Sequence, residues 1–137
     1  MKQEKILGIY MDHSVAQLME LSNDIIVTST IESQSVLMEG AEYLRKDEGL
    51  LHNIEHYQRS DYFKRLSSVM RDYDEVILFG PTDAKNELFN LVKDNHLFEK
   101  IKIEIQTADK MTENQQQAFV KEYYHETNMA SPPQKGM

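Results

Sequence analysis

Residues 75–88 read Glu-Val-Ile-Leu-Phe-Gly-Pro-Thr-Asp-Ala-Lys-Asn-Glu-Leu, and this stretch decides the fold class. The unbroken apolar run at 76–79 is typical of a strand that is covered on both faces. Gly80 and Pro81 end that strand, and apolar residues then recur at helical spacing from Ala84 onward. A strand that passes so abruptly into a helix predicts an α/β layer.

The turn between this strand and this helix is a candidate site. It contains Gly80, Thr82, Asp83 and Lys85 and follows the carboxyl end of a strand, where ligands often bind in open α/β sheets. Asp83 suits a helix start, both as a cap and through the helix dipole. The turn lacks the second Gly and the Gly-Lys-Ser/Thr ending of a phosphate-binding loop, so no nucleotide site is predicted.

The remaining elements follow from turn signals and periodicity. Residues 5–21 predict a hairpin that turns at Asp12 and Ser14, residues 25–31 a third antiparallel strand, and residues 57–73 a helix. Residues 32–56 show no clean period. After the strand and helix of the central unit, which reach about residue 94, alternating isoleucines at 101–105 predict a half-buried edge strand. Residues 112–115 have the spacing of a capping box that opens a last helix.

Length and composition indicate one α/β domain at residues 1–126 and a flexible tail at 127–137 that contains Pro132 and Pro133. The chain has no Cys, so disulfides and thiolate sites are excluded. No apolar run approaches the length of a membrane span, and we expect a cytoplasmic protein without membrane contact. The net charge of −8 disfavours broad nonspecific binding to nucleic acid.

The predicted order β-β-β-α-β-α-β-α resembles that of the ribonuclease-H-like class, a mixed sheet with helices packed on it. The hairpin residues 9–13, Ile-Tyr-Met-Asp-His, and the unit 76–88 narrow the resemblance. They resemble the middle domain of class 1 peptide-chain release factors, of the ribosome-rescue factor Pelota, and of stand-alone release-factor-like proteins. There a strand ending in Met-Asp-Gly opens the domain, and a later strand reaching Gly precedes a helix with Lys and a Glu-Leu pair. The resemblance covers about residues 4–125.

One departure from that family concerns catalysis. Release factors carry a Gly-Gly-Gln tripeptide in the connection between the third strand and the first helix, which corresponds to residues 32–56 here. Gly40 and Gly49 are isolated in this segment, and Gln34 has no Gly before it. Without adjacent glycines the backbone lacks the conformational freedom of that motif. We therefore expect no peptidyl-tRNA hydrolysis, and we interpret the segment as a binding element with a short helix at about 41–46.

The sequence predicts neither a metal-dependent nuclease nor a zinc site. A nuclease of this fold needs carboxylates that converge on metal ions, whereas Asp12, Asp74, Glu75 and Asp83 all have structural explanations at turns and element ends. The histidines of the segment 52–56, His-Asn-Ile-Glu-His, share a helix face but lack the Glu that follows the first His in zinc proteases. We predict no catalytic residue, no metal site and no cofactor.

One locally basic helix face is the candidate site for RNA or a protein partner. Basic side chains with nearby aromatic rings can hold phosphates and stack on bases. A solvated face balanced by Asp61, Asp72 and Asp74 is the alternative interpretation. The candidate residues are Arg59, Lys64, Arg65, Arg71, Tyr57 and Tyr62.

The leading functional hypothesis is a non-enzymatic, release-factor-like domain that associates with the ribosome or a translation factor. The alternative is a stand-alone interaction or regulatory module, considered also as a homodimer, that binds no RNA. An enzyme is the third class, either a metal-dependent nuclease or a hydrolase that uses the turn at 80–85.

Overall fold

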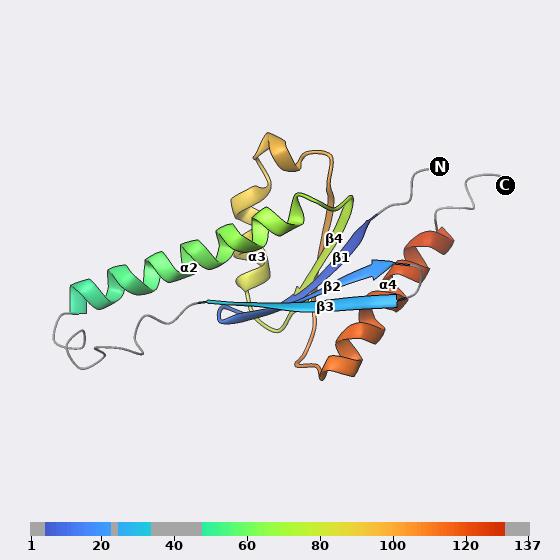
Figure 1. Cartoon of the computed structure of the whole chain (residues 1–137), viewed down its shortest axis with the longest axis horizontal. Helices are drawn as coiled ribbons and strands as arrows, with labels where there is room; N and C mark the ends of the chain where they lie inside the picture. Colours follow the sequence, from blue (N-terminus) through green and yellow to red (C-terminus); the bar gives the residue numbers. More distant parts are fainter. Residues whose placement is uncertain (1–4, 23–24, 34–47, 131–137) are drawn as a thin grey trace.

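The computed structural model describes residues 5–22, 25–33 and 48–130, and within residues 48–57 and 125–130 it describes the backbone alone. The elements follow one another as three strands, then helix, strand, helix, strand and helix, with one 3-10 turn before the last strand (Figure 1). They are β1 (Ile6–Met11), β2 (Val15–Ser22), β3 (Ile25–Glu32), α2 (Glu48–Met70), β4 (Glu75–Gly80), α3 (Ala84–Val92), η2 (His96–Phe98), β5 (Lys102–Thr107) and α4 (Glu113–Ala130).

The strands form one mixed sheet in the order β3-β2-β1-β4-β5. The first three strands are an antiparallel meander, in which Tyr10 lies opposite Gln17 and Leu18 opposite Ser29. β4 lies parallel to β1 on its other side, with Glu75 beside Ile6, and β5 lies parallel to β4. This sheet confirms the predicted mixed α/β architecture and is consistent with the ribonuclease-H-like class.

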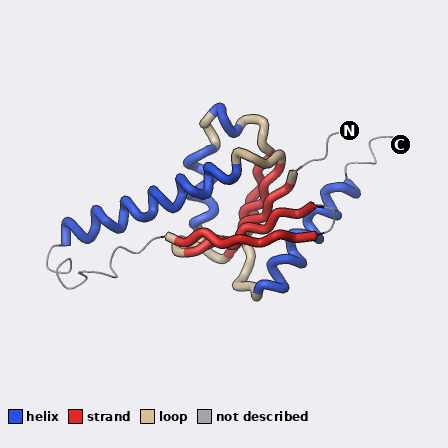
Figure 2. The backbone as a smooth tube through the Cα atoms, viewed as in Figure 1, coloured by secondary structure: helices blue, strands red, loops and turns tan. Residues whose placement is uncertain are grey.

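Helices cover both faces of the sheet, which explains the unbroken apolar run of β4 (Figure 2). Val76 and Leu78 belong to the core under α2 and α3, whereas Ile77 and Phe79 belong to the core under α4. All four side chains are fully buried. A fully buried side chain of this size contributes about 1.5–3 kcal/mol to stability, so β4 is the centre of the fold.

Helix α2 begins at Glu48, and the predicted start at about residue 57 was therefore wrong. Figure 1 shows the N-terminal half of α2 projecting away from the sheet. A helical segment with no sheet to pack against needs no apolar stripe, so its sequence carries no helical period. The predicted short helix at about 41–46 lies outside the described residues, as does the whole of the segment 34–47.

Helix α4 opens with the predicted capping box. The Thr112 hydroxyl accepts a hydrogen bond from the Gln115 backbone N–H at 3.2 Å, and the Gln115 side chain accepts one from the Thr112 N–H at 2.9 Å. The helix runs to Ala130, so residues 127–130 belong to it and not to a tail. Between Glu113 and Pro132 the sequence contains no Gly or Pro that would end the helix earlier. Residues 131–137 lie outside the described residues.

β5 is an edge strand with the predicted alternation. Ile103 and Ile105 are half-buried against the core, and the residues between them are exposed. Among the described helices, none is both long enough and apolar enough to span a membrane.

Candidate functional site

The carboxyl ends of β1 and β4 lie side by side, because these strands are parallel neighbours. From β1 the chain turns into β2 on one side of the sheet, and from β4 it continues through α3 to β5 on the other side. Connections that leave two neighbouring strands in opposite directions form a topological switch point, where open α/β sheets commonly bind ligands. The two turns at this point are residues 12–14 and 80–85.

Gly80 lets the second turn begin close against the end of β1. Its φ of +149° is rare for residues with side chains, and a Cβ at this position would lie 2.4 Å from the Met11 carbonyl oxygen. The turn therefore needs glycine for close backbone approach, which is a structural role.

The other residues predicted for this turn bond within the turn. The Thr82 hydroxyl accepts a hydrogen bond from the Ala84 N–H at 3.2 Å, and the Lys85 ammonium donates to the Thr82 carbonyl. Asp83 occupies the N-cap position of α3, but its side chain makes no capping bond and accepts from the Asn86 amide at 3.2 Å. Since Lys85 is only 2% exposed, its ammonium cannot reach a ligand in solution. The turn is present where the sequence predicts it, without an open cationic site.

His13 and Glu87 form a hydrogen-bonded pair at this switch point that the sequence did not predict. His13 Nε2 lies 2.8 Å from Glu87 Oε2, and the two side chains are 36% and 41% exposed. The hairpin turn and α3 supply one residue each, so no spacing rule in the sequence links them. A pair this exposed contributes at most about 1 kcal/mol to stability.

The sequence predicted Tyr62 as part of the basic and aromatic face, and the structure corrects this prediction. The Tyr62 side chain is fully buried, and its hydroxyl donates to the Asp12 carbonyl at 2.9 Å. Burial, reinforced by the nearby charge of Asp12, raises the pKa of Tyr62 well above its usual value. The Tyr62 ring faces the core, whereas the opposite face of α2 is exposed. The ring therefore cannot stack on a base of a bound RNA. Tyr57 has no described side chain.

The basic residues of this face separate into two groups. Lys64 and Arg71 are exposed, as the sequence predicted. Arg65 instead binds its own chain, through Asp61 Oδ2 at 3.0 Å and through the Glu32 carbonyl at 2.7 Å. Arg65 therefore fixes α2 to the end of β3, and the surface that remains for a phosphate is smaller than predicted.

Arg59 lies apart from that surface, at a groove between α2 and α3. The groove has a volume of about 440 Å³ and is lined by apolar, polar and charged side chains. Leu91 is 54% exposed there, and Glu87 joins the groove to the pair with His13. Sequence reasoning missed the groove, because its residues come from two helices that are separate in the sequence. The lining residues are Arg59, Ser60, Phe63, Glu87, Asn90 and Leu91.

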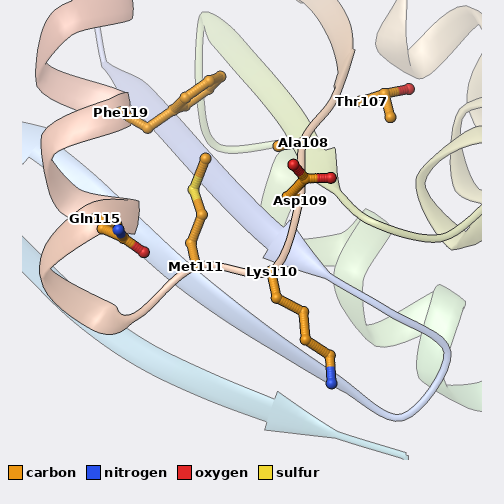
Figure 3. A pocket seen from close by; sticks show the side chains of 7 residues that line it. All are labelled: Thr107, Ala108, Asp109, Lys110, Met111, Gln115 and Phe119. Atoms are coloured by element: carbon orange, nitrogen blue, oxygen red, sulfur yellow. The ribbon is translucent and has the colours of Figure 1, made fainter.

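A second hollow lies where β5 leads into α4 (Figure 3). It has a volume of about 680 Å³, and Met111 and Phe119 point toward one another on one of its sides. Phe119 stacks on Phe79 at 4.2 Å, and the Tyr10 hydroxyl accepts the Met111 N–H at 2.9 Å. These contacts use the aromatic rings to hold α4 against the sheet. The lining residues are Thr107, Ala108, Asp109, Lys110, Met111, Gln115 and Phe119.

The carboxylates considered for a nuclease do not converge. Asp12 follows the end of β1, whereas Glu75 pairs with Ile6 at its beginning, so the two are about 20 Å apart along the strands. Asp12 accepts the Ser14 and Val15 N–H groups at 2.7 and 2.9 Å, which confirms its predicted role in the turn. Within residues 5–22, 25–33 and 48–130, no three His, Asp or Glu residues are grouped to hold a metal ion.

The sheet order, the helices on both faces and the switch point define a release-factor- and Pelota-like fold. The structure of Pelota from Thermoplasma acidophilum matches with a TM-score of 0.53 and 15% identity, over 81% of this chain and 30% of that one. Pelota from Archaeoglobus fulgidus matches with a TM-score of 0.53 and 10% identity, over 98% of this chain and 41% of that one.

An archaeal translation termination factor gives a TM-score of 0.49 at 15% identity, over 97% of this chain and 42% of that one. This chain thus spans less than half the length of each of these proteins. At such identities the likeness concerns the fold. No family model matches the sequence, and no curated protein matches it.

Proposed function

We propose that this chain is a non-catalytic, release-factor-like domain that associates with the ribosome or with a translation factor. The fold shared with two Pelota structures, over 81% and 98% of the chain, is the observation that carries the proposal. The proposal includes a cytoplasmic role in translation or ribosome rescue, and the shared fold supports it. The motifs of the hairpin 9–13 and the unit 76–88 support the same assignment.

The proposal of a non-catalytic role rests on how the chain uses its polar residues. The segment 32–56 has isolated glycines and no Gly-Gly-Gln tripeptide. At the switch point, Lys85 and Asp12 are already bonded to their own turns. His13 and Glu87 are bonded to each other there, and none of the hydrogen bonds among the described residues joins this pair to a nucleophile, which supports a non-catalytic role.

A partner is expected to contact the side of the molecule formed by α2 and α3. Lys64 is exposed on α2, Arg71 is exposed directly after the end of that helix, and both can hold phosphates. With a net charge of −8, a contact with ribosomal RNA has to be confined to such a local patch.

Co-sedimentation with ribosomes on sucrose gradients tests the proposal, in lysates from growing, starved and translation-stalled cells of the native source. We expect the wild-type protein in the ribosomal fractions and a shift to the soluble fractions for Lys64→Glu combined with Arg71→Glu. The matched control is Lys110→Glu combined with Lys121→Glu, which changes the charge equally on exposed residues beside and within α4, on the other face of the sheet. Wild-type protein that stays soluble under all three conditions would contradict the proposal.

The second candidate is an interaction module that binds no RNA. The burial of Tyr62 and the bonds of Arg65 to its own chain favour it, because both reduce the surface available to RNA. Binding to a single-stranded RNA at low and high salt separates the two candidates. Phosphate contacts weaken steeply as salt rises, whereas absence of binding at low salt favours the module.

A direct assay of peptidyl-tRNA hydrolysis on stalled ribosomes tests the non-catalytic part of the proposal. We expect purified wild-type protein to release no peptide, and Gln34→Ala to change nothing. Robust release that disappears in Gln34→Ala would show that the segment 32–56 is catalytic.

A further inference from the structure

The outer edge of β3 is the longest free sheet edge in the described part of the chain. β3 has eight residues, Ile-Ile-Val-Thr-Ser-Thr-Ile-Glu, and pairs with β2 on one side alone. Natural edge strands are usually blunted by Lys, Pro, bulges or a covering segment, because their free backbone groups pair readily with other strands. β3 contains no Lys, Pro or Gly, and its eight residues pair with β2 in continuous register.

The register shows which backbone groups point outward. The Ser33 N–H bonds to the Ser14 carbonyl, so this pair is a hydrogen-bonded pair between β3 and β2. Since hydrogen-bonded and non-hydrogen-bonded pairs alternate along an antiparallel ladder, every second residue of β3 bonds to β2. The residues between them direct their N–H and C=O groups to the free edge. They are Ile26, Thr28, Thr30 and Glu32.

One end of this row is already occupied. The Glu32 carbonyl accepts the Arg65 guanidinium at 2.7 Å, as expected for an outward-pointing group. The free pairing edge is therefore centred on Thr28, with Ile26 and Thr30 on its two sides.

Exposed apolar side chains accompany this edge. Ile25 is 64% and Val27 is 60% exposed, and both lie on the sheet face that α2 covers only farther along, near Ile31. Side chains of this size gain stability when they are removed from water. Free backbone groups and uncovered apolar residues thus coincide on one strand.

We propose that two copies of this chain associate through β3, antiparallel about a two-fold axis at Thr28. In this register Thr28 lies opposite the partner's Thr28, and Ile26 lies opposite the partner's Thr30. Each of these pairs closes two N–H···O=C bonds, so all three free residues of each edge are satisfied. The exposed Ile25 then faces the partner's Ile31.

A second copy fits this edge better than an unrelated strand for reasons of symmetry and charge. An antiparallel two-fold pairing uses the same three residues on both sides, and the free row is symmetric about Thr28. Glu32 is the sole charged residue of β3, and the two-fold axis places the two copies of Glu32 at opposite ends of the ladder. The net charge of −8 on each copy still opposes association, so the dimer should strengthen as salt rises.

Disulfide trapping tests the register, because the chain has no Cys of its own. In Thr28→Cys the two Cα atoms would face each other at about 5.5 Å, which suits a disulfide. In the matched control Thr30→Cys the two cysteines would lie about 14 Å apart along the strands and cannot bridge. We expect a covalent dimer under mild oxidation for the first variant and not for the second. Equal trapping at both positions, or none at Thr28→Cys, overturns the proposal.

Sedimentation of the intact chain over a range of concentrations tests the backbone bonds. Thr28→Pro removes the central outward N–H without touching the bonds to β2, and proline is tolerated at such edge positions. We expect at least about a tenfold weaker dimer for Thr28→Pro, and an unchanged dimer for Thr28→Val, which keeps the N–H. Wild-type protein that stays monomeric at all concentrations, or a dimer that persists in Thr28→Pro, overturns the proposal.

The tests of β3 pairing can fail or succeed independently of the proposed function. A monomer that still sediments with ribosomes refutes the pairing of β3 alone. Trapping of Thr28→Cys on a different protein from the ribosomal fraction also refutes a second copy as the occupant. Because phosphate contacts weaken with salt while this dimer strengthens, the two associations are distinguished by their opposite response.

Discussion

Two glycines allow close packing in the centre of the molecule, and they tolerate change differently. At Gly80 the nearest atom to an added Cβ is the Met11 carbonyl oxygen, a backbone atom at 2.4 Å. At Gly8 the nearest atom is Val120 Cγ2, a side-chain atom, also at 2.4 Å. A side chain can be shortened, whereas the backbone of β1 cannot move without disturbing the sheet.

Gly8→Ala should therefore lower stability by about 1–3 kcal/mol through overpacking against α4. Val120→Ala should also lower stability, because it leaves a cavity in the core under α4. The double variant should be more stable than the sum of the two losses predicts, by at least about 0.5 kcal/mol, since the smaller side chain makes room for the new methyl group. Urea unfolding of the four proteins measures this coupling, and strict additivity would contradict the packing.

Two tyrosines, the buried Tyr62 of α2 and the half-buried Tyr73 just after that helix, make stability depend on alkaline pH. Burial, followed by the hydrogen bond to Glu20 and the charges of Glu20 and Asp72, raises the pKa of Tyr73 to about 12. Tyr62 is shifted in the same direction. The unfolded chain loses these protons near pH ~10, and the folded protein keeps them longer. Their contribution is complete below pH ~10 and is lost as the pH rises toward about 12.

The double variant Tyr62→Phe and Tyr73→Phe should accordingly lose less stability than the wild type between pH ~9 and ~11. Urea midpoints measured across this range report the difference, since the other titrating groups are common to both proteins. If the urea midpoints of the two proteins fell equally with pH, neither hydroxyl would be held in its neutral form by the fold.

At the scale of elements, the sequence predicted the strands and helices whose residues follow a regular pattern. β4 was predicted from its apolar run, β5 from its alternating isoleucines, and the start of α4 from its capping box. The start of α2 was missed, because the projecting part of that helix packs on no sheet and has no stripe. The hydrogen bond between His13 and Glu87 and the groove at Arg59 were missed because tertiary contacts alone bring their residues together.

The capping box of α4 gives a test at this scale. Thr112→Ala removes the hydroxyl that accepts the Gln115 N–H and should lower stability by about 1 kcal/mol. Thr112→Ser keeps that hydroxyl and should lose clearly less. Thermal unfolding followed by circular dichroism compares the variants, and equal losses for Ala and Ser would show that the hydroxyl does not stabilise the helix.

For the whole molecule, the dominant electrostatic feature is an excess of acidic residues, 23 against 15 basic ones. The ion pair of Arg65 with Asp61 is partly exposed, and ion pairs leave this net excess unchanged. Like charges that are forced together in a compact state destabilise it, and salt screens them. The midpoint of urea unfolding at pH 7 should therefore rise between ~10 and ~300 mM NaCl.

The same experiment near pH 5.1, the isoelectric point of the sequence, is the matched control. There the net charge vanishes, so screening has no excess repulsion to remove and the midpoint should be nearly independent of salt or fall slightly as ion pairs weaken. A rise of equal size at both pH values would point to a salt effect on apolar burial instead of charge repulsion. Because the same repulsion opposes association of two copies, the concentration of half-dimerisation should fall over the same salt range at pH 7, and should respond little at pH 5.1.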